Sequence, residues 1–306
     1  MPSLDTISRA LVARTSITAA VFAMAITPNF LAVDLQAQQG QRPGQAGRAV
    51  SSPFVQPEPI DFNDHTGWTQ IFDGTSLKGW DGPTDVWHVE DGSIVGVSST
   101  EHPSGTTNII WRGGGEIGNF RLKVEMKLEG AGANGGIQYR SINNAPPPRQ
   151  IPPDRLAQMT AEQKQRMQQG QALTEKHAKW NLTGYQADFD YDNKYTGQLY
   201  EQGTPRGIIA WRGQMVATEA GRKPRLLASL GNSDELKSFI KPGEWNQYEI
   251  IADGNTLVHI INGHVMAVLV DTDPQYSQAK GLIGFEIEGG GDLKISHRNV
   301  WLKKLP

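Results

Sequence analysis

The fold is decided by residues 245–271, which read WNQYEIIADGNTLVHIINGHVMAVLVD. β-forming residues flank two dipeptides in this stretch, Asp253-Gly254 and Asn262-Gly263. Both central residues of a type I′ turn need positive φ, a conformation that Asn, Asp and Gly adopt most readily. Each dipeptide is therefore a strong hairpin signal, and the stretch predicts antiparallel strands joined by tight turns.

Short strands of the same kind continue on both sides of this stretch. In EIGNFRLKVEMKLEG, residues 116–130, apolar and charged residues alternate from Phe120 onward, which is typical of a strand with one wet face. GGIQYRS at 135–141 repeats the alternation, and two further strands close the chain at 281–289 and 293–305. Many short alternating strands separated by turns predict an all-β protein, an antiparallel β-sandwich.

One segment breaks the strand pattern. Residues 146–180 open with five prolines and then become helical over about 154–180. Thr160 resembles a helix start, and Gly170 is expected near the end of the helix. The segment lies between two strands and is predicted to be an insertion at the rim of the sheet, either a surface decoration or a lid over a substrate.

The N-terminal residues are predicted to lie outside the fold. Residues 1–37 combine Arg9 and Arg14 with a short apolar run and small residues, the pattern of a secretory signal peptide. Residues 38–60, rich in Gln, Gly and Pro, predict a flexible linker, so the domain is expected over 61–306. The protein is thus predicted to be exported, to the periplasm or beyond the cell. The alternative is a membrane anchor, but the run is short, and no stable membrane span is expected after removal of the signal.

Composition narrows the function classes. The chain has 306 residues, of which 38% are hydrophobic and 20% charged, and its formal net charge is −3. This is an ordinary globular composition without the basic excess that would suggest a nucleic-acid partner. The absence of cysteine excludes disulfides, thiolate metal sites and a cysteine nucleophile.

Residues 184–192, GYQADFDYD, alternate acidic or amide residues with aromatic ones. In a strand, Gln186, Asp188 and Asp190 would share a polar face opposite the aromatic side chains. The same alternation adds polar residues from two other predicted strands: Gln138, Arg140, Glu286 and Glu288. Such a face in a bent sandwich is a cleft that can hold a hydroxylated ligand by hydrogen bonds, with Trp and Tyr stacking on sugar rings. The competing interpretation is a solvated strand face.

A calcium loop is the second interpretation of this stretch. Asp188, Asp190 and Asp192 match the first three ligand positions of an EF-hand, but Asn193 replaces the required Gly and Leu199 the required Glu. An EF-hand is therefore rejected. No cofactor is predicted, and a different site for a divalent cation such as Ca²⁺ stays open.

Several motifs recur in a specific order along the chain. They include IFDGTSLKGW at 71–80, WHVEDGSIVG at 87–96, KPGEWNQ at 241–247 and HRNVWLKKL at 297–305. In this order they resemble the 3-keto-disaccharide hydrolase family, long known as a domain of unknown function, over residues 67–305. The resemblance implies a concanavalin A-like, laminarinase-like jelly roll. It also implies cleavage of glycosides whose sugar is already oxidised at carbon 3, in a saccharide or glycoside substrate.

The implied reaction needs a base at C2, donors or a cation for the enolate oxygen, and an acid for the leaving group. Asp188 is predicted to be the base, Arg140 the oxyanion partner and Glu201 the acid. Eight further residues are predicted to bind the substrate: Gln138, Gln186, Asp190, Tyr200, Trp211, Arg212, Glu286 and Glu288.

Two alternatives to this enzyme remain. A carbohydrate-binding or adhesion module would use the same fold without cutting the sugar. A conventional laminarinase-type glycosidase places Glu-x-Asp-x-Glu on one strand face. The chain has that spacing in Asp188-x-Asp190-x-Asp192, with two of the three side chains one methylene shorter.

Overall fold

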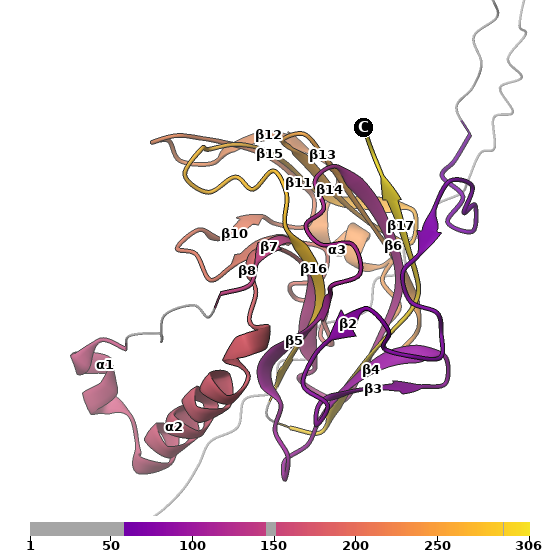
Figure 1. Ribbon diagram of the computed structural model, residues 1–306. Coiled ribbons are helices and arrows are strands. Elements are labelled where there is room, and N and C mark those ends of the chain that lie inside the picture. The colour runs from indigo at the N-terminus through magenta and orange to yellow at the C-terminus, as the bar shows by residue number, and fades with distance from the viewer. Residues whose placement is uncertain (1–57, 145–150, 290) are drawn as a thin grey trace, which may run out of the picture. The chain divides into compact units, whose positions relative to one another are not determined.

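Two β-sheets packed face to face form the body of the domain (Figure 1). One buried apolar cluster joins them, with Ile137 and Phe285 from one sheet and Leu122 and Ile250 from the other. The predicted antiparallel β-sandwich is confirmed. Among the paired strands described, only β11 (Gln214–Glu219) and β15 (His264–Thr272) run parallel.

The structure is a computed structural model that describes residues 58–144, 151–289 and 291–306. Residues 58–306 form one compact unit. The predicted signal peptide and most of the predicted linker lie outside the described residues.

The ten-stranded sheet also contains β1 (Thr69–Gln70), β3 (Trp87–Glu90), β4 (Ser93–Ser98), β6 (Phe120–Glu129), β12 (Arg225–Ser229), β13 (Asn246–Asp253), β14 (Thr256–Ile261) and β17 (Leu293–Lys304). Its order is β12-β11-β15-β14-β13-β6-β17-β4-β3, and β1 pairs with β17. The short helix α3 (Ser233–Lys237) follows β12.

The seven-stranded sheet consists of β2 (Trp80–Asp81), β5 (Gly105–Trp111), β7 (Asn134–Ile142), β8 (Thr183–Asp190), β9 (Leu199–Gln202), β10 (Gly207–Ala210) and β16 (Leu282–Gly289). Its order is β10-β9-β8-β7-β16-β5-β2. β16, from near the end of the chain, is thus inserted between β5 and β7.

The two hairpins within residues 245–271 differ in turn type. Asn262 and Gly263 both have positive φ, 50° and 82°, as a type I′ turn requires. In the other hairpin Asp253 pairs with Thr256, so the loop begins at Gly254, the loop residue with positive φ. This is the type II′ pattern, and the prediction of a type I′ turn centred on Asp-Gly was wrong there.

The predicted helical insertion is confirmed between β7 and β8 as α1 (Pro153–Gln158), α2 (Ala161–Lys176) and the 3₁₀ helix η1 (Ala178–Trp180). Thr160 caps α2 through a reciprocal capping box with Gln163. Gly170 lies inside α2, not near its end, and neither α1 nor α2 has a buried residue. No helix in the described ranges is long and apolar enough to cross a membrane.

Candidate active site

A polar groove lies on the outer face of the seven-stranded sheet, the face turned away from the apolar cluster. It is a cavity of about 410 Å³. Its lining residues come from β7, β8, β9, β10, β16 and the loop after β8: Asn134, Gln186, Asp188, Tyr195, Gln198, Tyr200, Gln202, Ile208 and Glu288. We call this cavity the groove.

Strand register explains why these side chains meet. Glu286 on β16 lies opposite Gly136 on β7, and Gly136 lies opposite Asp188 on β8. Directly opposed residues project to the same face, so both carboxyl groups point outward with a glycine between them. A Cβ at Gly136 would lie 2.6 Å from the carbonyl oxygen of Ala187 and 3.0 Å from Cγ of Gln186. Glycine therefore leaves the space that the Gln186 side chain occupies.

An amide network covers the floor of the groove. Gln138 Nε2 donates to Gln186 Oε1 at 2.6 Å, and Gln186 Nε2 donates to Glu286 Oε2 at 2.7 Å. Gln202 Nε2 donates to the other oxygen of Glu286 at 3.3 Å. Glu286 is 1% exposed and does not line the groove. It orients Gln186 and Gln202, two of the three glutamines that line the groove, and Gln138 supports Gln186 from below.

Asp188 combines burial with access to the groove. The residue is 7% exposed, and its carboxylate accepts a hydrogen bond from Gln198 Nε2. Burial raises the pKa of Asp188 well above its ordinary value, and the negative charges of Asp190 and Glu288 raise it further. A carboxylate in this setting is a stronger base than one in water.

Two glutamates extend this cluster of acidic groups. Burial raises the pKa of Glu286 well above its ordinary value, helped by the charges of Glu288 and Asp188. Glu288 stands at the exposed edge and accepts a hydrogen bond from Asn134 Nδ2 at 2.9 Å. None of the described residues that line the groove is cationic. The cluster therefore tends to keep protons that isolated carboxyl groups would lose, and a protonated carboxyl group can donate one.

The three aspartates of the 188–192 repeat have different environments. Asp190 accepts hydrogen bonds from the backbone N–H groups of Lys194, Tyr195 and Thr196 at 2.7–3.0 Å. It thus closes its own loop and does not line the groove, which corrects the predicted substrate contact. Asp192 is exposed. Only Asp188 of the repeat lines the groove, although strand alternation alone would place all three aspartates on one face.

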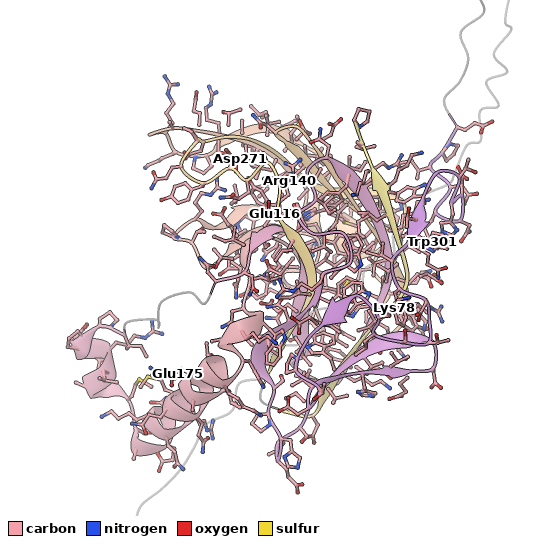
Figure 2. All side chains as sticks on the ribbon, viewed as in Figure 1. Lys78, Glu116, Arg140, Glu175, Asp271 and Trp301 are labelled. Carbon is pink, nitrogen blue, oxygen red and sulfur yellow. The ribbon has the colours of Figure 1, made fainter. Side chains whose placement is uncertain are left out.

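Arg140 lies outside the groove, which corrects its predicted role as oxyanion partner. Its guanidinium donates to the carbonyl oxygens of Gly118, Gly254 and Gln278 and to Oδ1 of Asn119 at 2.7–3.2 Å. Gly118 and Asn119 closely follow Glu116 in the chain, and the labels of Arg140 and Glu116 lie near each other in Figure 2.

The register of β7 explains this outcome. The pairing of β7 with β8 shifts between Tyr139 and Ile142, and Arg140 there has a φ of 44°. A β-bulge redirects side chains and breaks strict alternation. Gln138 therefore stays on the polar face, whereas Arg140 leaves it.

Glu201 is also corrected, because it points between the sheets. It lies opposite Tyr185 on the face that carries Leu199, and it is 1% exposed. Arg206 binds both of its carboxylate oxygens at 2.7 Å and also reaches Asp271 at 2.8 Å. Glu201 is one half of a buried ion pair and has no path to a ligand in the groove.

The two predicted residues after β10 have other partners. The Arg212 guanidinium donates to backbone carbonyls of Ser233, Asn193 and Thr196, so its predicted substrate contact is corrected. Trp211 is 44% exposed and does not line the groove, but its ring lies 6.3 Å from that of Tyr195, which does.

Sequence reasoning missed five lining residues: Asn134, Tyr195, Gln198, Gln202 and Ile208. Alternation along β9 could have found Gln202, which is two positions after Tyr200. No periodic signal marks the two loop residues before β9. Within the described ranges, no group of three or more His, Asp or Glu side chains has the arrangement of a metal site.

Solved structures of low similarity share the sandwich architecture. A proposed glycosyl hydrolase from Parabacteroides distasonis is 19% identical, with 79% of this chain and 95% of that chain covered and a TM-score of 0.43. A carbohydrate-binding module from Bacillus subtilis is 11% identical, with 74% and 96% covered and a TM-score of 0.40. A β-glucanase from Bacillus licheniformis is 11% identical, with 78% and 99% covered and a TM-score of 0.39. These likenesses are too distant to assign a function.

The family is shown by sequence. A search of curated proteins found no match. The profile of the 3-keto-alpha-glucoside-1,2-lyase-like domain, in contrast, matches residues 67–303, most of the chain and nearly all of the sandwich. This match confirms the resemblance seen in the sequence motifs. The chain therefore belongs to the 3-keto-alpha-glucoside-1,2-lyase-like domain family.

Proposed function

We propose that the protein is an exported enzyme that cleaves 3-keto-glycosides by elimination and hydration in the groove. The observation that carries the proposal is a buried carboxylate, Asp188, facing a cavity that a second carboxyl group, Glu288, also lines. Family membership supports 3-keto-glycosides as the substrate class.

Asp188 is the proposed base. A ketone at C3 acidifies the proton on C2, and the Asp188 carboxylate removes that proton to give an enolate. The enolate then expels the substituent on C1, and a C1–C2 double bond forms. Water then adds to C1 as hydroxide, and the proton that it releases restores the acid that protonated the leaving group. Asp188, whose carboxyl proton exchanges with solvent while the intermediate is bound, gives a proton to C2, so the sum of the steps is hydrolysis.

Glu288 replaces Glu201 as the proposed acid. It lines the groove at its exposed edge, and protein atoms around its carboxyl group raise the pKa of Glu288. In its protonated form it can give a proton to the departing glycosidic oxygen. Neutral amide groups, such as those of Gln198 and Gln202, take the enolate-binding role that Arg140 cannot fill.

The test compares the 3-keto and ordinary forms of one disaccharide in D₂O. We expect turnover of the 3-keto form with deuterium at C2 of the sugar product. Asp188→Asn should lower kcat on the order of 10²-fold or more, the usual effect of losing a positioned general base. Asp192→Asn is the matched control, because Asp192 belongs to the same repeat but is exposed. Full activity of Asp188→Asn without deuterium at C2 would eliminate this mechanism.

Sugar binding without cleavage is the second candidate. It is favoured by one observation: the described lining residues include no cation to stabilise an enolate. A lectin needs no base. In that case neither the wild type nor Asp188→Asn would turn over the sugar, and the substitution would change only the affinity. Binding of both sugar forms without product would support this alternative.

A further inference from the structure

A second cavity adjoins the groove. Its volume is about 700 Å³, and it lies between α2 and the edge formed by β5 and β16. We call it the helix cavity. It is lined by Thr100, Pro103, Gly105, Thr106, Arg166, Gln169, Gly170, Leu173, Thr174, Glu288 and Gly289. Glu288 lines both cavities, so the two share a boundary.

The C-terminal half of α2 is tied to the sandwich next to this cavity. Leu173 packs closely over Gly105, where a Cβ would lie 3.0 Å from that of Leu173. The ring of His177 lies against the carbonyl of Ser104, with Nδ1 3.1 Å from the oxygen. Lys176 forms an ion pair with Asp85. The wall that α2 contributes is therefore built into the fold.

The lining of the helix cavity is polar with a small apolar area. Arg166 supplies a guanidinium, Gln169 an amide and three threonines hydroxyl groups, while Leu173 and Pro103 are apolar. Arg166 is the cationic residue among the described residues that line the two cavities. Hydroxyl, amide and guanidinium groups match a polyhydroxylated ligand, and the apolar area suits one face of a sugar ring.

We infer that the helix cavity is the subsite for the leaving group of the substrate. The inference rests on the proposed function, in which Glu288 protonates the glycosidic oxygen. That oxygen joins the oxidised ring to its C1 substituent, so the acid must stand where the two halves of the substrate meet. With the oxidised ring beside Asp188, the C1 substituent points across Glu288 toward α2. A second sugar, or another polyhydroxylated group, then contacts Arg166 and Gln169.

Two substrates that carry the same oxidised ring allow the leaving-group subsite and the proposed function to be tested separately. One is a 3-keto-disaccharide, and the other is the methyl glycoside of the same 3-keto sugar. In Gln169→Ala and Arg166→Ala we expect kcat/KM to fall about 3- to 10-fold for the disaccharide, which corresponds to one or two lost hydrogen bonds. The methyl glycoside should be cleaved as by the wild type. Gln168→Ala is the matched control, because Gln168 is an exposed neighbour that does not line the cavity.

Gly170→Phe provides a steric version of the test. Gly170 lines the cavity, no heavy atom lies within 4 Å of a Cβ there, and the residue is helical, so a large side chain can be placed beside the cavity without backbone strain. We expect kcat/KM for the disaccharide to fall 10-fold or more and that for the methyl glycoside to stay within about 2-fold, since ring and acid are untouched.

The outcomes are distinguishable. If the wild type cleaves both substrates and none of the α2 variants discriminates between them, the subsite is wrong and the proposed function stands. If the α2 variants weaken both substrates equally, the subsite is also wrong. If the wild type cleaves neither substrate, the proposed function fails and the leaving-group subsite fails with it.

Discussion

At the scale of single residues, the groove holds a buried carboxyl group whose position does not stabilise the fold. Burial of Asp188 disfavours its charged form, and no ion pair compensates for that burial in its described contacts. By contrast, Arg206 binds both oxygens of Glu201, which is also buried. A charge that is left uncompensated beside a cavity is typical of a functional site.

This contrast predicts that removal of the Asp188 charge stabilises the protein. The pKa of Asp188 is higher in the folded chain than in the unfolded chain. Asp188 therefore contributes its full stabilisation below its unfolded pKa, and this stabilisation is lost as the pH rises through its folded pKa. At neutral pH the wild type therefore carries a penalty that Asp188→Asn lacks. Because the fold disfavours the charged form, the variant should be more stable than the wild type at neutral pH. Denaturant unfolding at neutral pH measures the gain.

The gain should shrink as pH approaches about 4, where the aspartate of the unfolded chain also becomes protonated. Asp192→Asn should change the free energy of unfolding little at either pH, since surface substitutions are usually within about 0.5 kcal/mol. A less stable Asp188→Asn at neutral pH would mean that the hydrogen bond from Gln198 outweighs the burial of the charge.

The coupling between Asp188 and Glu288 gives a pH prediction. The negative charge of Glu288 raises the pKa of Asp188, so Glu288→Gln should lower that pKa. Since the base acts when deprotonated, the acidic limb of the kcat/KM profile should move to lower pH, even though the loss of the acid lowers the rate itself. A pH–rate profile of the residual activity checks the direction. An unmoved or raised limb would show that Asp188 does not control it.

At the scale of elements, strand alternation predicts the groove wherever strands are regular. On β8 and β16 the pattern places Gln186, Asp188 and Glu288 on the outer face, as observed. It fails at Arg140, because a bulge with positive φ is a local backbone event that apolar periodicity does not reveal. It also fails for Asp190, whose partners belong to the loop that follows β8.

Arg140 is therefore expected to stabilise the fold and not the transition state. Arg140→Ala removes a 2% exposed guanidinium and takes a donor from three backbone carbonyls. Leaving buried acceptors unpaired costs about 1–3 kcal/mol each, so we expect a loss of roughly 3 kcal/mol in unfolding free energy. KM of the folded fraction should stay near the wild-type value.

The matched control is Arg222→Ala. Its side chain is 66% exposed and forms an ion pair with Glu219. Exposed pairs contribute about 0–1 kcal/mol, so this variant should unfold almost like the wild type. If Arg140→Ala kept full stability but lost activity, the original assignment of Arg140 to the oxyanion would be restored.

At the scale of the whole molecule, the sequence predicts the sandwich because its signals are local. The hairpin at Asn262-Gly263 and the alternation along β6 both depend on neighbouring residues only. The position of β16 between β5 and β7 depends on pairing between segments distant in the chain, and it is this pairing that brings Glu286 and Glu288 to Asp188. For the same reason the sequence reveals the helical insertion but not the cavity that α2 forms with β5.

The sandwich should fold without α1 and most of α2. Replacing residues 151–172 by a Gly/Ser linker of equal length removes α1 and most of α2 but keeps Leu173 and the anchoring contacts of Lys176 and His177. Neither helix buries a residue, and β7 and β8 pair directly, so the sandwich should stay folded. At constant loop length the closure entropy changes little, and we expect Tm within about 4 °C of the wild type.

Activity should divide between the two substrates in this variant. The groove is intact, so the 3-keto methyl glycoside should be cleaved at nearly the wild-type rate. The disaccharide loses its contacts with Arg166 and Gln169, and its kcat/KM should fall about 10-fold, as expected for the loss of roughly 1.4 kcal/mol of binding. A variant that unfolds would instead show that the helices stabilise the sandwich. A folded variant that cleaves both substrates equally well would identify the insertion as a surface decoration, because a wall that contacts the leaving group cannot be removed without changing how that group is bound.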